Sequence, residues 1–85
     1  MRPDPLAVLR LTPDDTGEIF SPDHNRPVKL NATGAVIWQV LAGRGGEADC
    51  IAELSRHFPR LPEEKIRTDV RQFIQLLKLK GLLLE

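Results

Sequence analysis

The chain has 85 residues, of which 41% are hydrophobic, so it is long enough for one domain with a modest core. Lys and Arg together number 12, as do Asp and Glu, which gives a formal net charge of zero. The two signs are also evenly spread: residues 1–31 carry four basic and five acidic side chains, residues 32–62 three and three, and residues 63–85 five and four. Because affinity for nucleic acids depends on neutralising phosphates, this distribution argues against a protein that binds DNA or RNA.

Cys50 is the only cysteine, which excludes an internal disulfide and a cysteine-based metal cluster. The N-terminal apolar stretch is short and is interrupted by Arg10, so it does not fit a secretion signal. No window approaches the roughly 18 apolar residues of a membrane-spanning helix. We therefore expect a single soluble domain over residues 1–85, located in the cytoplasm.

The N-terminal part of the chain predicts three short strands. Residues 6–11 (LAVLRL) form an apolar run that is followed by the turn-forming sequence TPDDTG. Residues 18–21 (EIFS) and 28–30 (VKL) are the second and third candidates, and the loop sequence PDHNRP separates them. Because strands that are consecutive in sequence tend to pair, these segments predict an antiparallel sheet.

From Asn31 onward the hydrophobic period becomes that of a helix. Apolar or small side chains from Gly34 to Leu41 recur at i, i+3, i+4 and i+7, and Asn31 is a suitable N-cap. We expect Gly43 to end this helix with a left-handed turn. A second helix is predicted over residues 47–57 and a third over residues 62–80. The order of elements predicts a small α+β domain.

Candidate catalytic and metal-binding residues are few. His24 lies in a proline-rich loop and His57 at a helix end, without the spacing of a metal site. Cys50 has no histidine at a fixed local spacing, and Asp14 with Asp15 is ordinary turn chemistry. The sequence GRGG lacks a following Lys-Ser or Lys-Thr, so it does not fit a phosphate-binding loop. We therefore expect a protein that is not an enzyme and that holds no cofactor or metal.

The third predicted helix carries a second stripe beside its apolar face, in which Arg67, Arg71, Ile74 and Lys78 follow one another at spacings of 4, 3 and 4. One interpretation is a solvated flank whose long side chains cover the edge of the core. The other is one wall of a groove for an extended, partly acidic peptide, with the exposed edge of residues 28–30 as the second wall. The sequence pattern alone leaves both interpretations open.

A further set of positions consists mostly of core and capping residues: Leu30-Asn31, Ala35, Ile37-Trp38, Gly43, Asp69-Val70, Phe73, Leu77 and Gly81-Leu82-Leu83. Their joint order and spacing resembles the PqqD-like proteins, which are recognition elements for the precursors of ribosomally synthesised and post-translationally modified peptides (RiPPs). The resemblance covers about residues 17–84 and implies a winged-helix-like fold, with a three-stranded antiparallel sheet followed by three helices. It also implies a non-catalytic role in which the leader segment of a precursor peptide adds to the third strand.

The resemblance and the stripe together predict which residues bind the peptide and which partners meet this chain. A free-standing domain of this size is similar to PqqD itself and to the leader-binding proteins of lasso-peptide biosynthesis. The expected partners are a leader peptide and a RiPP-modifying enzyme or leader peptidase, with Leu76, Leu79 and Leu82–Leu84 as candidate contacts for the enzyme. A winged-helix regulator that binds DNA is the alternative function. The predicted peptide-binding residues are Val28, Lys29, Leu30, Arg67, Val70, Arg71, Ile74 and Lys78.

Overall fold

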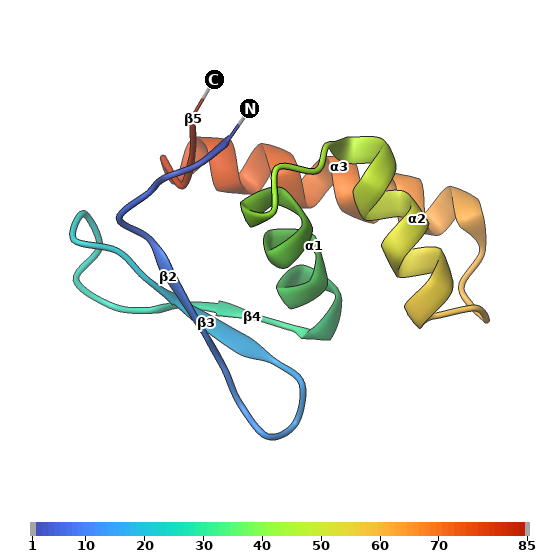
Figure 1. Cartoon of the computed structure of the whole chain (residues 1–85), viewed down its shortest axis with the longest axis horizontal. Coiled ribbons are helices and arrows are strands. Elements are labelled where there is room, and N and C mark those ends of the chain that lie inside the picture. The colour runs from blue at the N-terminus through green and yellow to red at the C-terminus, as the bar shows by residue number, and fades with distance from the viewer. Residues whose placement is uncertain (1, 85) are drawn as a thin grey trace.

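The computed structural model describes residues 2–84, and its larger sheet has three antiparallel strands (Figure 1). These strands are β2 (Val8–Leu11), β3 (Gly17–Phe20) and β4 (Val28–Leu30), and they pair in the order β2-β3-β4. The helices α1 (Ala32–Ala42), α2 (Glu47–His57) and α3 (Glu63–Leu79) follow in sequence. The predicted α+β fold, with a three-stranded sheet followed by three helices, is thereby confirmed.

A second, two-stranded sheet joins the two ends of the chain and was not predicted. Its strands are β1 (Arg2–Pro3) and β5 (Leu83–Leu84), which pair in antiparallel fashion. The backbone N–H of Asp4 also donates to the carbonyl of Leu82 at 2.9 Å. Figure 1 shows the blue start of the described chain beside β5. Strands of two residues are too short to show a hydrophobic alternation, so sequence pattern cannot detect them.

The ends of the helices follow local capping chemistry. The Oδ1 atom of Asn31 accepts a hydrogen bond from the backbone N–H of Gly34 at 2.8 Å, so the predicted N-cap of α1 is confirmed. At the other end of α1, the left-handed residue is Arg44, with φ of 72°, whereas Gly43 has φ of −85°. The predicted left-handed turn therefore exists one residue later than expected. The chain then returns close to α1: a Cβ atom on Gly45 would lie 2.6 Å from Cγ1 and 3.0 Å from the carbonyl oxygen of Val40, so a larger residue there would force a shift.

The core lies between the sheet and the helices, with α1 at its centre. Helix α1 packs on α2 and also contacts β2, β3 and β4, while α3 packs on α2 and β5. Trp38 is 3% exposed, which agrees with its predicted role as a core residue. The buried side chains that form one cluster are Ile19, Leu30, Ile37, Trp38, Leu41, Cys50, Leu54, Ile66, Val70, Ile74, Leu77, Leu82 and Leu83.

Candidate functional site

Strand β4 is an open edge of the larger sheet. Among residues 2–84 it pairs only with β3, with Val28 opposite Ile19, Lys29 opposite Glu18 and Leu30 opposite Gly17. In an antiparallel ladder, successive residues direct their backbone N–H and C=O groups alternately toward one neighbour and the other. The side of β4 that faces away from β3 therefore offers backbone donors and acceptors to a further strand.

A groove separates this edge from α3. One hollow of about 580 Å³ is lined by residues 24–30 on one side and by Phe73, Leu76, Leu77 and Lys80 on the other. A second hollow of about 420 Å³ shares Phe73 and Leu76 and continues past Asn31 toward the start of α3. We call the two together the β4–α3 groove.

The two walls of the groove match in length. Three residues of a strand such as β4 span about 10 Å, at roughly 3.3 Å per residue. The helical segment from Phe73 to Lys80 rises over about 10.5 Å, at roughly 1.5 Å per residue. An extended peptide of a few residues can therefore contact both walls along their whole length.

The structure places Val28, Lys29 and Leu30 on the groove, as predicted from sequence, although their part in peptide binding stays a prediction. It does not place the predicted helix stripe there. Val70 is fully buried and Ile74 is only 6% exposed, so both are core residues and do not form a ligand wall. Their spacing was correct for a helix face, but that face belongs to the core.

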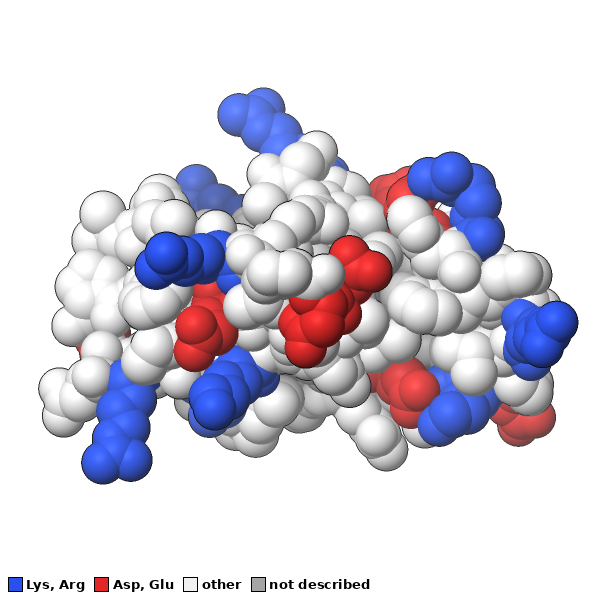
Figure 2. Space-filling model, turned by 90° about the horizontal axis from the view of Figure 1, so that it is seen from below, with Lys and Arg blue, Asp and Glu red and all other residues white. Residues whose placement is uncertain are grey.

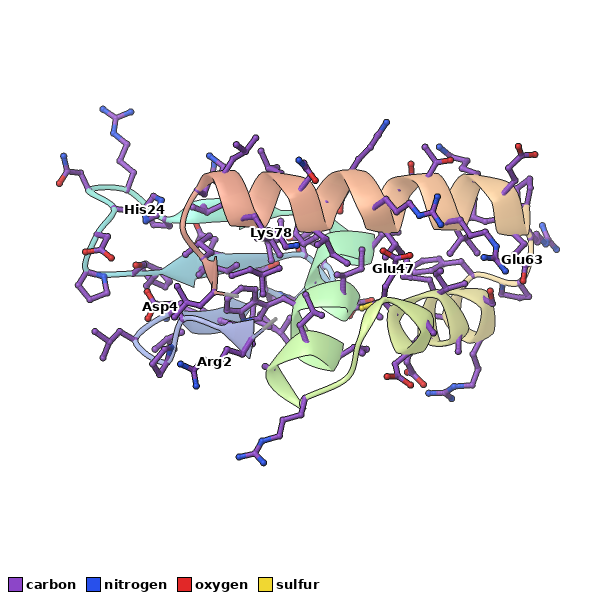
Figure 3. The ribbon with its side chains drawn as sticks, turned by 90° about the horizontal axis from the view of Figure 1, so that it is seen from above. Arg2, Asp4, His24, Glu47, Glu63 and Lys78 are labelled. Atoms are coloured by element: carbon purple, nitrogen blue, oxygen red, sulfur yellow. The ribbon has the colours of Figure 1, made fainter. Side chains whose placement is uncertain are left out.

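The predicted basic residues lie on the flank of α3 that faces away from β4. The Nε atom of Arg71 lies 3.3 Å from a carboxylate oxygen of Glu47 at the start of α2. Arg67 lies 3.8 Å from Glu63, one turn earlier on α3. Figure 3 shows Lys78 on the same side of α3 as Glu47, the first residue of α2. These side chains therefore do not form the helix wall of the β4–α3 groove, and their part in peptide binding stays a prediction.

The helix wall consists instead of residues from the opposite flank, which sequence analysis passed over. Phe73 was named from sequence only among the mostly core positions of the family resemblance, but it is partly buried and lines both hollows. Leu76 is 44% exposed and was considered only as a contact for a partner enzyme. The large apolar side chains of Phe73 and Leu76 were the feature of the sequence that could have indicated this wall, because the solvent-facing flank of a helix usually carries polar residues.

The two ends of the β4–α3 groove differ in charge. Arg26, Lys29 and Lys80 line the end of the groove where β4 begins, and none of them forms an ion pair with any residue from 2 to 84. At the other end, Lys65 lies 3.4 Å from Asp69, so its charge is locally balanced. The groove therefore has an apolar floor and one basic end.

The electrostatics of the visible surface do not favour the DNA-binding alternative. Figure 2 views the molecule from below and shows basic and acidic side chains interspersed on that face. On α2, Arg56 lies 2.9 Å from Glu53, and the hydrogen bond between them lowers the pKa of Glu53. Helix α2 also begins with Glu47 and Asp49, which would repel phosphates.

Among the described residues, Cys50 lacks the environment of an activated thiol. Cys50 is fully buried, and burial, followed by the charges of Asp49 and Glu47, raises the pKa of its thiol to about 11. A thiol with that pKa is a poor nucleophile at neutral pH. Among residues 2–84, no three His, Cys, Asp or Glu side chains converge as metal ligands would, and no helix is both long and apolar enough to cross a bilayer.

Comparison with known proteins agrees with this architecture. A solved structure of TbiB1 in complex with the TbiA(beta) leader peptide resembles the chain with a TM-score of 0.83 and 20% sequence identity, over 96% of this chain and 93% of that chain. At this identity the likeness establishes the fold. A comparison with curated protein sequences finds no match. Residues 18–83 match the family described as coenzyme PQQ synthesis protein D (PqqD). Since that match spans most of the chain, this protein belongs to the PqqD family.

Proposed function

We propose that this protein binds the leader segment of a ribosomally made precursor peptide in the β4–α3 groove and delivers the precursor to a modifying enzyme. The observation that carries the proposal is the open edge of β4, which lies across the groove from the apolar side chains of Phe73 and Leu76. Backbone hydrogen bonds to β4 would supply affinity, and the apolar wall would select side chains. The similar protein TbiB1 was solved in complex with a leader peptide, which supports a leader as the ligand of this fold.

Binding the leader would act on the reaction through proximity. A tethered precursor presents its core segment at a high effective concentration to an enzyme that contacts the same domain. A leader peptidase that acts with a cyclase, as in lasso-peptide biosynthesis, is the type of partner we favour. This protein would contribute recognition, and its partner would contribute catalysis.

Delivery requires a second contact surface that remains free when the groove is occupied. Of the leucines proposed from sequence, Leu82 and Leu83 are buried at 0% and 4% exposure, so they are not available to an enzyme. Leu79 is 79% exposed and does not line the groove. The cross-strand pair of Val8 and Phe20, which are 59% and 39% exposed, offers another apolar surface on the sheet. We propose these two places as the contacts for the enzyme.

The proposal is tested with the synthetic leader of a precursor encoded beside the gene for this protein. Titration into ¹⁵N-labelled protein should shift the amide signals of Val28–Leu30 and of the α3 segment from Phe73 to Lys80. The other edge strand, β2, provides the internal control, because it is also an edge of the sheet but lines neither hollow of the β4–α3 groove. Shifts confined to β2, or the lack of any shift at Val28–Leu30, would contradict the proposal.

A matched pair of leucine variants tests the helix wall. Leu76→Glu should weaken leader binding about tenfold, since removing roughly half of a leucine's burial costs about 1.4 kcal/mol. Leu79→Glu lies three residues away on the same helix and is more exposed, so its affinity should stay within about twofold of the wild type. Equal losses in the two variants would argue against this position of the groove.

A further inference from the structure

The outer face of the larger sheet carries a row of alternating charges. Arg10 on β2 is directly opposite Glu18 on β3, and Glu18 is directly opposite Lys29 on β4. The signs across the three strands are therefore positive, negative and positive. Opposite charges at directly paired positions stabilise a sheet by about 0.2–1 kcal/mol, and like charges destabilise it. The row ends at Lys29, on the open edge.

The side chains next to Lys29 in sequence point to the other face of β4. Leu30 is buried in the core, and Val28 is partly buried against it. Because side chains alternate along a strand, the side chains of a peptide added to β4 also point alternately to the outer face of the sheet and to the groove. Its residue paired with Lys29 lies on the outer face, and the residues before and after it face Phe73 and Leu76 across the groove.

We infer, building on the proposed function, that the bound peptide carries an Asp or Glu opposite Lys29 with an apolar residue on each side of it. The acidic residue continues the alternation of Arg10, Glu18 and Lys29 into a fourth strand. The two apolar residues cover the floor of the groove. Arg26 and Lys80 add positive charge at the same end of the groove and favour further acidic residues of the ligand there.

The basic residues on the other flank of α3 do not need an acidic residue of the ligand as a partner. Arg67 and Arg71 already lie within 3.8 and 3.3 Å of the carboxylates of Glu63 and Glu47. Lys29 has only Glu18 as its paired neighbour, and the two form no ion pair within 4.0 Å among the residues described. The uncompensated charge at the sheet edge thus selects the ligand, and the basic stripe of α3 does not.

The test is a selection from a display library of random peptides against the wild type and two variants. Against the wild type, we expect enrichment of a three-residue pattern in which one acidic residue stands between two apolar ones. Against Lys29→Glu, the central position should change to Lys or Arg while the apolar neighbours remain. Arg67→Glu is the matched control, an exposed charge reversal away from the groove, and should select the same peptides as the wild type.

The affinities of one selected peptide for the wild type and the variants then measure the pairing of its central acid with Lys29 directly. Replacing its central acid with lysine should weaken binding to the wild type about fivefold and should restore binding to Lys29→Glu. Lys29→Gln, which introduces no repulsion with Glu18, should bind both peptides within about twofold of each other. This second variant keeps the test valid if Lys29→Glu folds poorly.

The outcomes separate this inference from the proposed function. If peptides are selected and shift the β4 amides, but show no acidic preference or keep it against Lys29→Glu, the inference is wrong and the proposed function stands. If no peptide is enriched on the wild type, the proposed function fails, and this inference fails with it.

Discussion

The junction between β4 and α1 depends on one side chain, and removing it should lower the stability of the whole domain. Oδ1 of Asn31 accepts hydrogen bonds from the backbone N–H of Gly34 at 2.8 Å and from Oγ1 of Thr33 at 3.0 Å. Asn31→Ala leaves the Gly34 N–H without this partner, at a residue that is itself buried. Loss of an N-cap costs about 1 kcal/mol of unfolding free energy, within a range of about 0.5–2.

That cost converts into a measurable change for a domain of this size. A loss of 1 kcal/mol lowers the melting temperature of a 60–100-residue domain by about 4–8 °C. Urea and thermal unfolding can be followed by the fluorescence of Trp38, the only tryptophan, which is 3% exposed in the folded protein. Far-UV circular dichroism should give the same midpoint if unfolding is two-state.

Asn31→Asp is the matched control for this prediction. It keeps the accepting oxygen and places a negative charge at the N-terminus of α1, whose first turn has no acidic residue. We expect its stability to equal that of the wild type or to exceed it by about 0.3–1 kcal/mol. The capping argument would be refuted if Asn31→Ala were as stable as the wild type, or if Asn31→Asp lost as much stability as Asn31→Ala.

Three further predictions concern burial and perturbed pKa values. The pKa of the Cys50 thiol is raised to about 11, so at pH 8 the thiol should react with a thiol reagent about 100-fold more slowly than a free cysteine. Unfolding the protein in urea should restore the normal rate, and a fast reaction in the native state would contradict the burial of Cys50. Hydrogen bonds from Thr12 and Thr16 lower the pKa of Asp14 from 3.8 to about 2, so its stabilising effect should be complete above pH 3.8 and should be lost as the pH falls toward 2. An NMR titration of that carboxyl checks this, and a midpoint near 3.8 would refute it. Ile74→Ala should cost about 2–4 kcal/mol of unfolding free energy because Ile74 belongs to the core, whereas Leu79→Ala should cost less than about 0.5 kcal/mol. Similar urea midpoints for the two variants would show that Ile74 is exposed rather than part of the core.

Most of the fold could be predicted because its elements carry repeated local signals. Helix α2 and strand β4 have the predicted bounds, and α3 begins one residue later than expected and ends one residue earlier. The pairing of β1 with β5 could not be predicted, since it joins residues about 80 positions apart through two short segments. The left-handed residue after α1 was assigned to Gly43 on propensity, whereas the structure has it at Arg44, directly before the close return of the chain at Gly45.

The candidate site could be predicted only in part. Strand β4 was identifiable as a wall because it is the last strand of a meander, and the last strand of a meander is an edge. The helix wall was assigned to the wrong flank. Both flanks of α3 border its buried face, and a spacing of 4, 3 and 4 describes either of them equally well.

The amino-acid sequence by itself determined the order of the three strands of the larger sheet and the three helices, and the cap at Asn31. These properties depend on side chains within a few residues of one another, so the local period and capping chemistry are sufficient to establish them. Only the tertiary structure decided that Phe73 and Leu76 face β4 while Arg67 and Arg71 face away from it. The physical reason is that the rotation of α3 about its axis is set by how Ile66, Val70 and Leu77 pack into the core formed by the rest of the chain.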